Sequence, residues 1–246
     1  NKTELLMEFD KAFSDHCRNE NIVSEYIRFS PWLKNHVDFK EYYDLRYRTQ
    51  TMYIDLKTDY FNLEFSHARR KTIRKAIKNN VEIKFYFNDD KVNEFMTLYN
   101  NMIERQGAGS FYKFSESFIK NLFSLMKTNI FMANAIYEGK CVSSMILLFD
   151  DNYLHCYLGG NNYEYANMGG NSLIVYEVAE WAKRRNIKVL HLGGALHESL
   201  MVYKKGFTRN CILDYYVGTK IRNNEIYNRL VDMCGKNNTG YFPEYR

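Results

Sequence analysis

The chain alternates between two periodicities of hydrophobic and polar residues, one typical of helices and one of strands. Apolar side chains that recur three and four positions apart predict amphipathic helices. The segments with this spacing are 2–20, 60–80, a stretch that follows Asp89–Asp90, 115–127, 172–185 and 198–205. Alternation with period two, or a short apolar run, predicts strands. These segments are 51–56, 81–87, 130–137, 141–149, 153–160, 187–192 and strands near 211–221.

The strand segments between residues 130 and 160 are separated only by short polar turns. Glu138–Gly139 and Asp150–Asp151–Asn152 fit tight turns, so we expect an antiparallel meander of three strands. A helix, a strand and another helix follow it. A long antiparallel run before such a crossover predicts an α+β fold with a mixed, mostly antiparallel sheet flanked by helices on both faces. A doubly wound parallel sheet would alternate strands and helices from the start.

Composition narrows the classes of function. A length of 246 residues allows one large domain or two small ones. The net charge of +5 permits an anionic ligand but is low for a nucleic-acid-binding protein. Five cysteines without a CxxC pair predict reduced thiols and a cytoplasmic protein, and the histidine spacings predict no metal site. We expect neither a membrane span nor a signal peptide, because no long apolar run occurs and the opening residues are polar.

Two Gly-Gly pairs stand where a backbone can meet a ligand. The first lies in a turn that leads into a predicted helix, where bare N–H groups suit a phosphate or a developing oxyanion. The residues of this candidate cofactor site are Met168, Gly169, Gly170, Asn171 and Ser172. Asn171 or Ser172 can cap the helix. The second pair, Gly193–Gly194, ends a strand and lets a ligand lie against bare backbone. An ordinary tight turn into a helix is the alternative for the first pair.

Candidate chemistry also lies at the end of the last predicted helix before Gly206–Phe207. Tyr203 and Lys204 could supply protons or hold a negative group. The alternative is a helix that ends in cations because they complement its dipole. His155 and His191 lie within strand patterns, where a histidine satisfied inside the core is more common than a base.

Two further segments carry candidate substrate-binding residues. The helix at 67–78 is rich in arginine and lysine, includes Arg74, and has a narrow apolar stripe of Ile73 and Ile77. It is either a solvated basic face or a surface for a polyanion, RNA or a nucleotide-linked substrate. The loop at 104–114, broken by GAGS at 107–110, holds Arg105, Tyr112 and Lys113. It is either a substrate lid or a mobile connection.

Four segments together resemble the GNAT acyltransferase superfamily, and within it the branch of Fem-type peptidoglycan aminoacyltransferases and their acetyltransferase relatives. They are RRKTIRKAIKNNVEI, MIERQ…FYKF, WAKRRNIKVLHLGG and SLMVYKKGF. Three positions depart from the pattern of these families. The glycine turn reads AlaAsnMetGlyGlyAsn from Ala166 in place of Arg/Gln-x-x-Gly-x-Gly/Ala, Ala195 replaces a frequent third glycine, and Tyr203 replaces phenylalanine.

The resemblance implies two GNAT-like halves, a shortened one at 1–88 and an intact acyltransferase domain at 89–246. It implies an N-acyltransferase that moves an acyl group from acyl-CoA to a primary amine, on a sugar or peptide precursor of the bacterial cell envelope. Tyr203 would then protonate the departing thiolate, while backbone N–H groups near a splayed strand polarise the carbonyl.

Two alternatives stay open. Lys204 and the basic helix favour an aminoacyl-tRNA donor, for which Lys204 would steady charge at the acyl group. The altered glycine turn and the short first half favour a GNAT-fold module that binds a glycan or a partner without catalysis.

Overall fold

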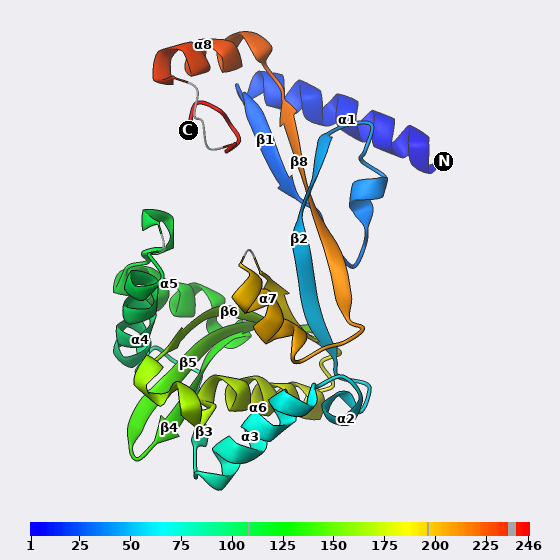
Figure 1. Cartoon of the computed structure of the whole chain (residues 1–246). Helices are drawn as coiled ribbons and strands as arrows, with labels where there is room; N and C mark the ends of the chain where they lie inside the picture. Colours follow the sequence, from blue (N-terminus) through cyan, green and yellow to red (C-terminus); the bar gives the residue numbers. More distant parts are fainter. Residues whose placement is uncertain (108, 196, 236–239) are drawn as a thin grey trace. The chain divides into compact units, whose positions relative to one another are not determined.

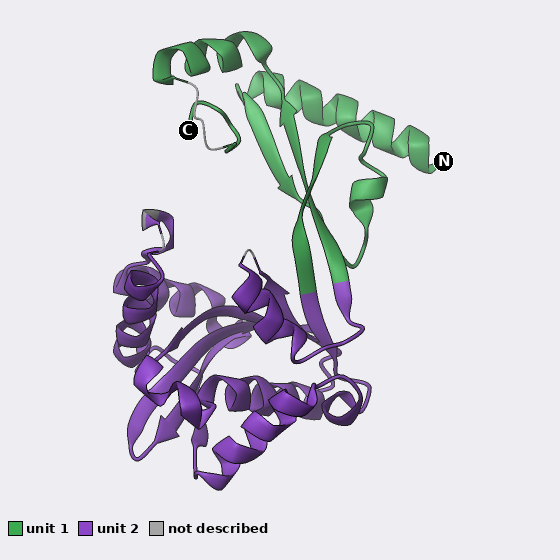
Figure 2. Ribbon diagram, in the orientation of Figure 1, with its two compact units in different colours: residues 1–51, 213–246 green, residues 52–212 purple. Residues whose placement is uncertain are grey.

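The computed structural model describes residues 1–107, 109–195, 197–235 and 240–246, and it divides into two compact units. One unit contains residues 1–51 and 213–246, so it holds both ends of the chain, and the other contains residues 52–212 (Figure 2). These units differ from the two halves at 1–88 and 89–246. The division at residue 88 predicts that each half resembles a GNAT domain, which the division into compact units does not test. It therefore stays a prediction.

The second unit is built on a mixed sheet that matches the expected fold class. Its strands lie in the order β2-β7-β6-β5-β4-β3. Their bounds are Asp44–Asp55 for β2, of which 52–55 belong to this unit, Glu82–Tyr86 for β3, Ile130–Tyr137 for β4, Lys140–Phe149 for β5, Tyr153–Asn161 for β6 and Val189–Gly194 for β7. The pairs from β3 to β6 are antiparallel, whereas β6 and β7 are parallel. The expected meander of three strands is therefore confirmed.

Helices cover both faces of this sheet (Figure 1). The longer ones are α3 (His67–Lys78) and α6 (Gly170–Arg184) on one face, and α4 (Val92–Arg105) and α5 (Glu116–Met126) on the other. The shorter ones are α2 (Tyr60–Leu63), α7 (Glu198–Lys205) and the 3-10 turns η2 (Ser110–Tyr112), η3 (Lys127–Asn129) and η4 (Tyr163–Met168). The helical spacing read from the sequence thus predicts α4, α5 and α6 to within a few residues.

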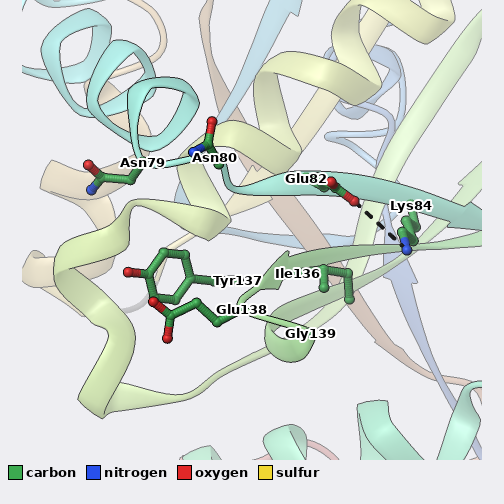
Figure 3. Close-up of a pocket in the computed structure, with 8 residues that line it drawn as sticks. All are labelled: Asn79, Asn80, Glu82, Lys84, Ile136, Tyr137, Glu138 and Gly139. Carbon is green, nitrogen blue, oxygen red and sulfur yellow. Dashed lines mark ion pairs between the residues drawn. The ribbon is translucent and has the colours of Figure 1, made fainter.

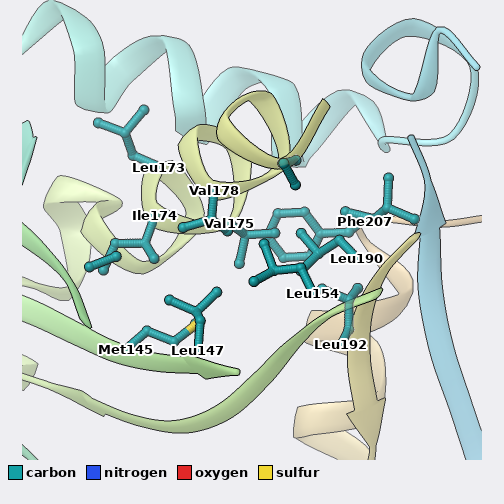
Figure 4. Packing of buried hydrophobic residues seen from close by; sticks show 14 of the residues in the cluster. Met145, Leu147, Leu154, Leu173, Ile174, Val175, Val178, Leu190, Leu192 and Phe207 are labelled. Atoms are coloured by element: carbon teal, nitrogen blue, oxygen red, sulfur yellow. The ribbon is translucent and has the colours of Figure 1, made fainter. Parts of the chain in front are cut away.

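Alternate residues of the central strands divide the core into two clusters. On β4, Phe131 and Ala133 face the cluster shared with α6, while Ile130 and Met132 face the cluster shared with α4 and α5. Figure 4 shows the first cluster, in which Val175 and Val178 of α6 lie over the sheet. Burial on both faces explains why β4 reads as a nearly continuous apolar run rather than as an alternating strand.

The helix predicted over 60–80 is interrupted. Residues 64–66 separate α2 from α3, and the Ser66 side chain caps α3 by accepting from Arg69 N at 3.2 Å. The cause of the break is Glu64, a buried carboxylate that accepts hydrogen bonds from the loop after α7, including those from Arg209 N at 2.8 Å and Asn210 N at 3.0 Å. A periodicity cannot reveal this, because the partners lie about 145 residues away.

The first unit combines segments from both ends of the chain. Its strands lie in the order β1-β8-β2, with β1 at Ser24–Arg28 and β8 at Ile212–Ile221. Its helices are α1 (Lys2–Asn19), η1 (Asn35–Val37) and α8 (Asn224–Cys234). Arg222 joins these parts, since its guanidinium contacts Glu25 at 2.6 Å and Asp10 at 3.1 Å. The strand β1 pairs with β8 in antiparallel fashion.

Candidate active site

The strands β6 and β7 separate soon after they meet. Their parallel register joins Tyr153, Leu154 and His155 to Val189, Leu190 and His191, and no pairing between these two described strands continues beyond it. Yet β6 runs on to Asn161 and β7 to Gly194. The strand β6 also has a bulge at Tyr157, because Leu158 pairs with Ile146 while Cys156 pairs with the next residue of β5, Leu147. A bulge breaks the regular ladder and bends its strand, so the geometry is the splayed strand that the resemblance implies.

Lys204 reaches the end of β7 from α7. Its Nζ donates to the carbonyl oxygen of Gly194 at 2.6 Å. Gly193 has φ of +76°, and a Cβ there would lie 3.4 Å from the same Nζ. Burial lowers the pKa of Lys204, opposed by nearby Cys156. The structure therefore brings together Lys204 and the second Gly-Gly pair, which the sequence placed in one candidate site.

Tyr203 points its hydroxyl into the protein. The hydroxyl is buried and has no hydrogen-bond partner of good geometry among the described residues. Burial raises the pKa of Tyr203 to about 12, and the opposing influences are the charge of Arg69 and the polar side chains of Ser172 and Asn171. The end of α7 thus lies against the first turn of α6, so the candidate catalytic tyrosine and part of the candidate glycine turn are neighbours.

The glycine turn is packed closely. Gly169 adopts φ of +74° and is the N-cap of α6, with no side chain capping the helix. A Cβ on Gly169 would lie 2.8 Å from Thr72 Cγ2, and one on Gly170 would lie 3.0 Å from Ala135 Cβ. Both glycines are buried and let α6 begin against α3 and β4. The expectation that Asn171 or Ser172 caps the helix is wrong, since the N-cap is Gly169. Met168 packs against the core.

Arg69 is the residue that sequence reasoning missed. Its Nη1 donates to Ser172 Oγ at 2.7 Å and its Nη2 donates to the Tyr203 carbonyl oxygen at 3.0 Å. Its guanidinium carbon lies 4.2 Å from the Tyr203 ring centroid and 4.5 Å from that of Phe207. Burial lowers its pKa. The side chain therefore ties α3 to the start of α6 and to the end of α7.

A signal for Arg69 exists in the helical spacing. The buried stripe of α3 contains Ile73 and Ala76, which are fully buried, whereas Ile77 of the predicted stripe is 51% exposed. Arg69 stands four residues before Ile73 and seven before Ala76, on the same face of the helix. An arginine on a buried stripe is the unusual observation that could have identified it.

Two histidines lie where β6 and β7 part. Their Nδ1 atoms are 3.0 Å apart, so one ring donates to the other. Burial lowers the pKa of His155, and burial with the charges of His155 and Lys204 lowers the pKa of His191 to about 3. Burial also raises the pKa of Cys156, the next residue on β6, to about 12. At neutral pH this part of the splay holds neutral imidazoles and a protonated thiol.

The candidate substrate-binding residues lie in three places. Arg105 is at the end of α4, with its guanidinium 4.5 Å from the ring centroid of Tyr163, which begins η4 before the glycine turn. Tyr112 and Lys113 are exposed, and the Tyr112 carbonyl oxygen accepts from Tyr99 Oη at 2.7 Å. Arg74 faces α2, 5.8 Å from the Phe61 ring centroid, so it stands apart from the contacts around Tyr203.

The predicted break at 107–110 includes residue 108, which lies outside the described residues. The helix before it, α4, ends at Arg105.

A cavity of about 460 Å³ opens at the edge of the second unit's sheet (Figure 3). Its lining comes from the end of α3, from β3 and from the turn between β4 and β5: Asn79, Asn80, Glu82, Lys84, Ile136, Tyr137, Glu138 and Gly139. The candidate catalytic and cofactor residues do not line it. Asn79 of this lining donates from Nδ2 to Met168 Sδ at 3.6 Å, which connects the cavity wall to the glycine turn.

Across residues 1–107, 109–195, 197–235 and 240–246, no three His, Cys, Asp or Glu side chains are grouped so as to hold a metal ion. In that described part of the chain no helix has both the length and the apolar character that crossing a bilayer requires.

Comparison with known families decides the assignment. The sequence model of a family described as acetyltransferase (GNAT) domain matches residues 67–205, more than half of the 246-residue chain. The chain belongs to this GNAT family. The match covers α3, the splayed strands and α7 with Tyr203 and Lys204, so the features described above lie within the GNAT domain. Acyl transfer is the general chemistry that this membership supports.

Solved structures share the GNAT fold at low sequence identity. FemX matches with a TM-score of 0.70 and 12% identity, over 93% of this chain and 79% of FemX. L-PGS from Bacillus licheniformis matches with a TM-score of 0.60 and 14% identity, over 87% of this chain and 72% of that one. A tandem GNAT protein from the clavulanic acid biosynthesis pathway matches with a TM-score of 0.53 and 9% identity, over 87% and 69%. No curated protein matches the sequence. The Fem-type GNAT resemblance is confirmed at the level of fold.

Proposed function

We propose that the chain is an N-acyltransferase that moves an acyl group from acyl-CoA to a primary amine on a cell-envelope sugar or peptide precursor. The observation that carries this proposal is the position of Tyr203, which lies beside the uncapped start of α6. The next residue on α7, Lys204, bonds to the end of β7 through its Nζ. An acid, a set of backbone N–H groups and a splayed strand are the parts that acyl transfer from a thioester requires.

The residues fit an acyl-CoA donor in two respects. The first turn of α6 has no side-chain cap, so its N–H groups suit an anionic part of the donor. The backbone of β6 beyond His155 is free of β7 and would offer N–H groups to the acyl oxygen, each such donor being worth about 3 kcal/mol in the transition state. A bound acyl-CoA supplies the activated carbonyl and a thiolate leaving group.

The protein's own groups would then act on protons and geometry. Since the pKa of Tyr203 is raised to about 12, its phenol is protonated at neutral pH and can donate to a departing thiolate. Lys204 would hold the end of β7 through the Gly194 carbonyl and so fix the width of the splay. Holding the amine and the carbonyl together removes much of the entropic barrier.

A Fem-type transfer from aminoacyl-tRNA is the second candidate. In its favour are Lys204 and the exposed cations of α3, which are Lys71, Arg74, Lys75 and Lys78. The net charge of +5 is low for a tRNA-binding protein, so we favour acyl-CoA. A GNAT-fold module that binds without catalysis is the third candidate, and the packed glycine turn is the observation in its favour.

Thermal unfolding with three probes separates the candidates. Acetyl-CoA at 100 times its Kd would add about 2.7 kcal/mol of stability, which is a Tm rise of roughly 5–10 °C for a protein of this size. We expect this rise with acetyl-CoA and none with an equal concentration of AMP. Retention of aminoacyl-tRNA on the protein without a response to acetyl-CoA would replace the first candidate by the second. If acetyl-CoA gives no rise in Tm and aminoacyl-tRNA is not retained, the third candidate, a binding module without catalysis, is favoured.

A further inference from the structure

Arg69 is a partly buried cation for which the described residues provide no carboxylate. Two of its nitrogens donate to Ser172 Oγ and to the Tyr203 carbonyl oxygen, both neutral acceptors. Its third nitrogen, Nε, is buried without a partner among the described residues. Burying a guanidinium without an anion is costly. The acidic group close enough to act on its charge is the Tyr203 phenol.

The group next to this cation is the phenol of Tyr203. Tyr203 Oη is buried and has no hydrogen-bond partner of good geometry among the described residues, and its ring lies 4.2 Å from the Arg69 guanidinium carbon. Gly206 permits this approach, because a Cβ there would lie 3.1 Å from both Nε and Nη2 of Arg69. A cation and an acidic hydroxyl are therefore held together, and the pair lacks a negative charge until the phenol loses its proton.

We propose that Arg69 is a positioning residue that holds Tyr203 in place and stabilises its phenolate. The inference rests on the proposed acyl transfer and adds a residue to it. When the carbon–sulfur bond of the donor breaks, the Tyr203 O–H bond breaks and an S–H bond forms, which leaves a phenolate beside Arg69. The phenolate then regains a proton from the nitrogen of the newly formed amide, so the proton lost by the amine ends on the thiol.

The surroundings of the pair support this role over a purely structural one. Arg70, the next residue on α3, gives Nη1 to the carbonyl oxygens of Phe65 and Asn62 at 2.6 and 3.0 Å, and these bonds tie α3 to the segment before it. Arg69 instead covers two aromatic rings, and its buried Nε has no partner among the described residues. An opposite charge at 4–6 Å commonly lowers the pKa of an acid by about 1–3 units.

The test measures the ionisation of position 203 directly. A polyfluorinated tyrosine, whose phenol is several units more acidic than that of tyrosine so that even a raised pKa falls within the range measured, is placed at residue 203, and its 19F signal is followed from pH 6 to 11. We expect Arg69→Met to raise the apparent pKa of this phenol by about 1 unit or more, and Arg69→Lys to raise it by less because the charge remains. Arg70→Met is the matched control on the same helix and should leave the pKa unchanged.

Each outcome decides something. Equal pKa values in the parent, Arg69→Lys and Arg69→Met proteins would overturn the proposal, as would an equal shift in Arg70→Met. If Arg69→Met fails to fold, the comparison of Arg69→Lys with Arg70→Met decides. The measurement needs no donor. A shift in a protein that ignores acetyl-CoA would therefore keep the Arg69–Tyr203 pair and reject the acyl-CoA assignment.

Discussion

A methyl group at Gly160 should separate α4 from the sheet. Gly160 lies near the end of β6, beneath the backbone of α4. A Cβ on this residue would lie 2.6 Å from Tyr99 N, 2.7 Å from Leu98 C and 2.9 Å from Tyr99 Cα. All three are helix backbone atoms, so no rotamer change can relieve the overlap and the helix itself must move.

The size of the effect follows from that overlap. Ordinary contact for a Cβ begins at 3.4 Å, so α4 must shift by about 0.8 Å at Tyr99. This helix contributes Phe95, Tyr99 and Ile103 to the buried cluster on its face of the sheet. Overpacking of a close-packed core costs about 1–3 kcal/mol, and we expect Gly160→Ala to lie near 3 kcal/mol because the obstacle is backbone.

The neighbouring glycine provides a matched control. A Cβ on Gly159 would meet only the Ser144 carbonyl oxygen, at 3.5 Å, which is normal contact. Gly159→Ala should change stability by less than about 1 kcal/mol, and in the stabilising direction if the lower conformational entropy of the unfolded chain dominates. Urea unfolding followed by Trp181 fluorescence, in a Trp32→Phe background, reports on the second unit. Equal free energies of unfolding for the two alanine variants would refute the close approach of α4 to β6.

Three further results are expected from solution measurements. Burial alone would raise the pKa of Glu64, but hydrogen bonds led by that from Asn210 lower it, so the carboxylate stabilises the fold above its pKa. Glu64→Gln should therefore cost about 1.5–3 kcal/mol of unfolding free energy in urea at pH 7 and little at pH 3. A cost that does not change with pH would contradict this. The pKa of His191 is about 3 in the folded protein and about 6.5 in the unfolded chain, so the unfolded chain takes up the proton first as the pH is lowered, and stability decreases as the pH decreases from about 6.5 to about 3. His191→Gln should reduce that fall by up to about 1.4 kcal/mol per pH unit in unfolding titrations, and an unchanged slope would rule out this assignment. Mass spectrometry after iodoacetamide treatment should show exposed Cys234 modified well before Cys156, whose thiol pKa is about 12; equal rates would be inconsistent with that burial.

Local patterns were sufficient for the meander and the longer helices of the second unit. The turn at Glu138–Gly139 places Glu138 at φ of +48° and Gly139 at +75°, which is the backbone that a tight hairpin demands. The apolar spacing of α4 likewise follows from its own residues, since Val92, Phe95, Met96, Tyr99 and Ile103 are all buried. In both cases the determinants lie within a few residues of one another.

The splay and the first unit depend on distant partners. The parallel pairing of β6 with β7 stops at His155 and His191, and the hydrophobic pattern of neither segment predicts where this pairing ends. The first unit joins β1 to β8 across about 190 residues of chain, which a division at residue 88 cannot anticipate. Of the candidate site, the sequence indicated Tyr203, Lys204 and both glycine pairs, but it did not indicate Arg69, because a basic helix is normally solvated.

The packing of the glycine turn also determines the position of Arg69. A side chain at Gly169 would strike Thr72, which stands three residues after Arg69 on the same helix. The bare backbone at Gly169 therefore lets α3 approach the start of α6, and that approach brings Arg69 within 2.7 Å of Ser172 Oγ. The turn thus has a physical reason for its glycines even where they contact no ligand. Its contribution to acyl transfer would be to set a cation beside Tyr203, while the uncapped N–H groups of α6 remain available.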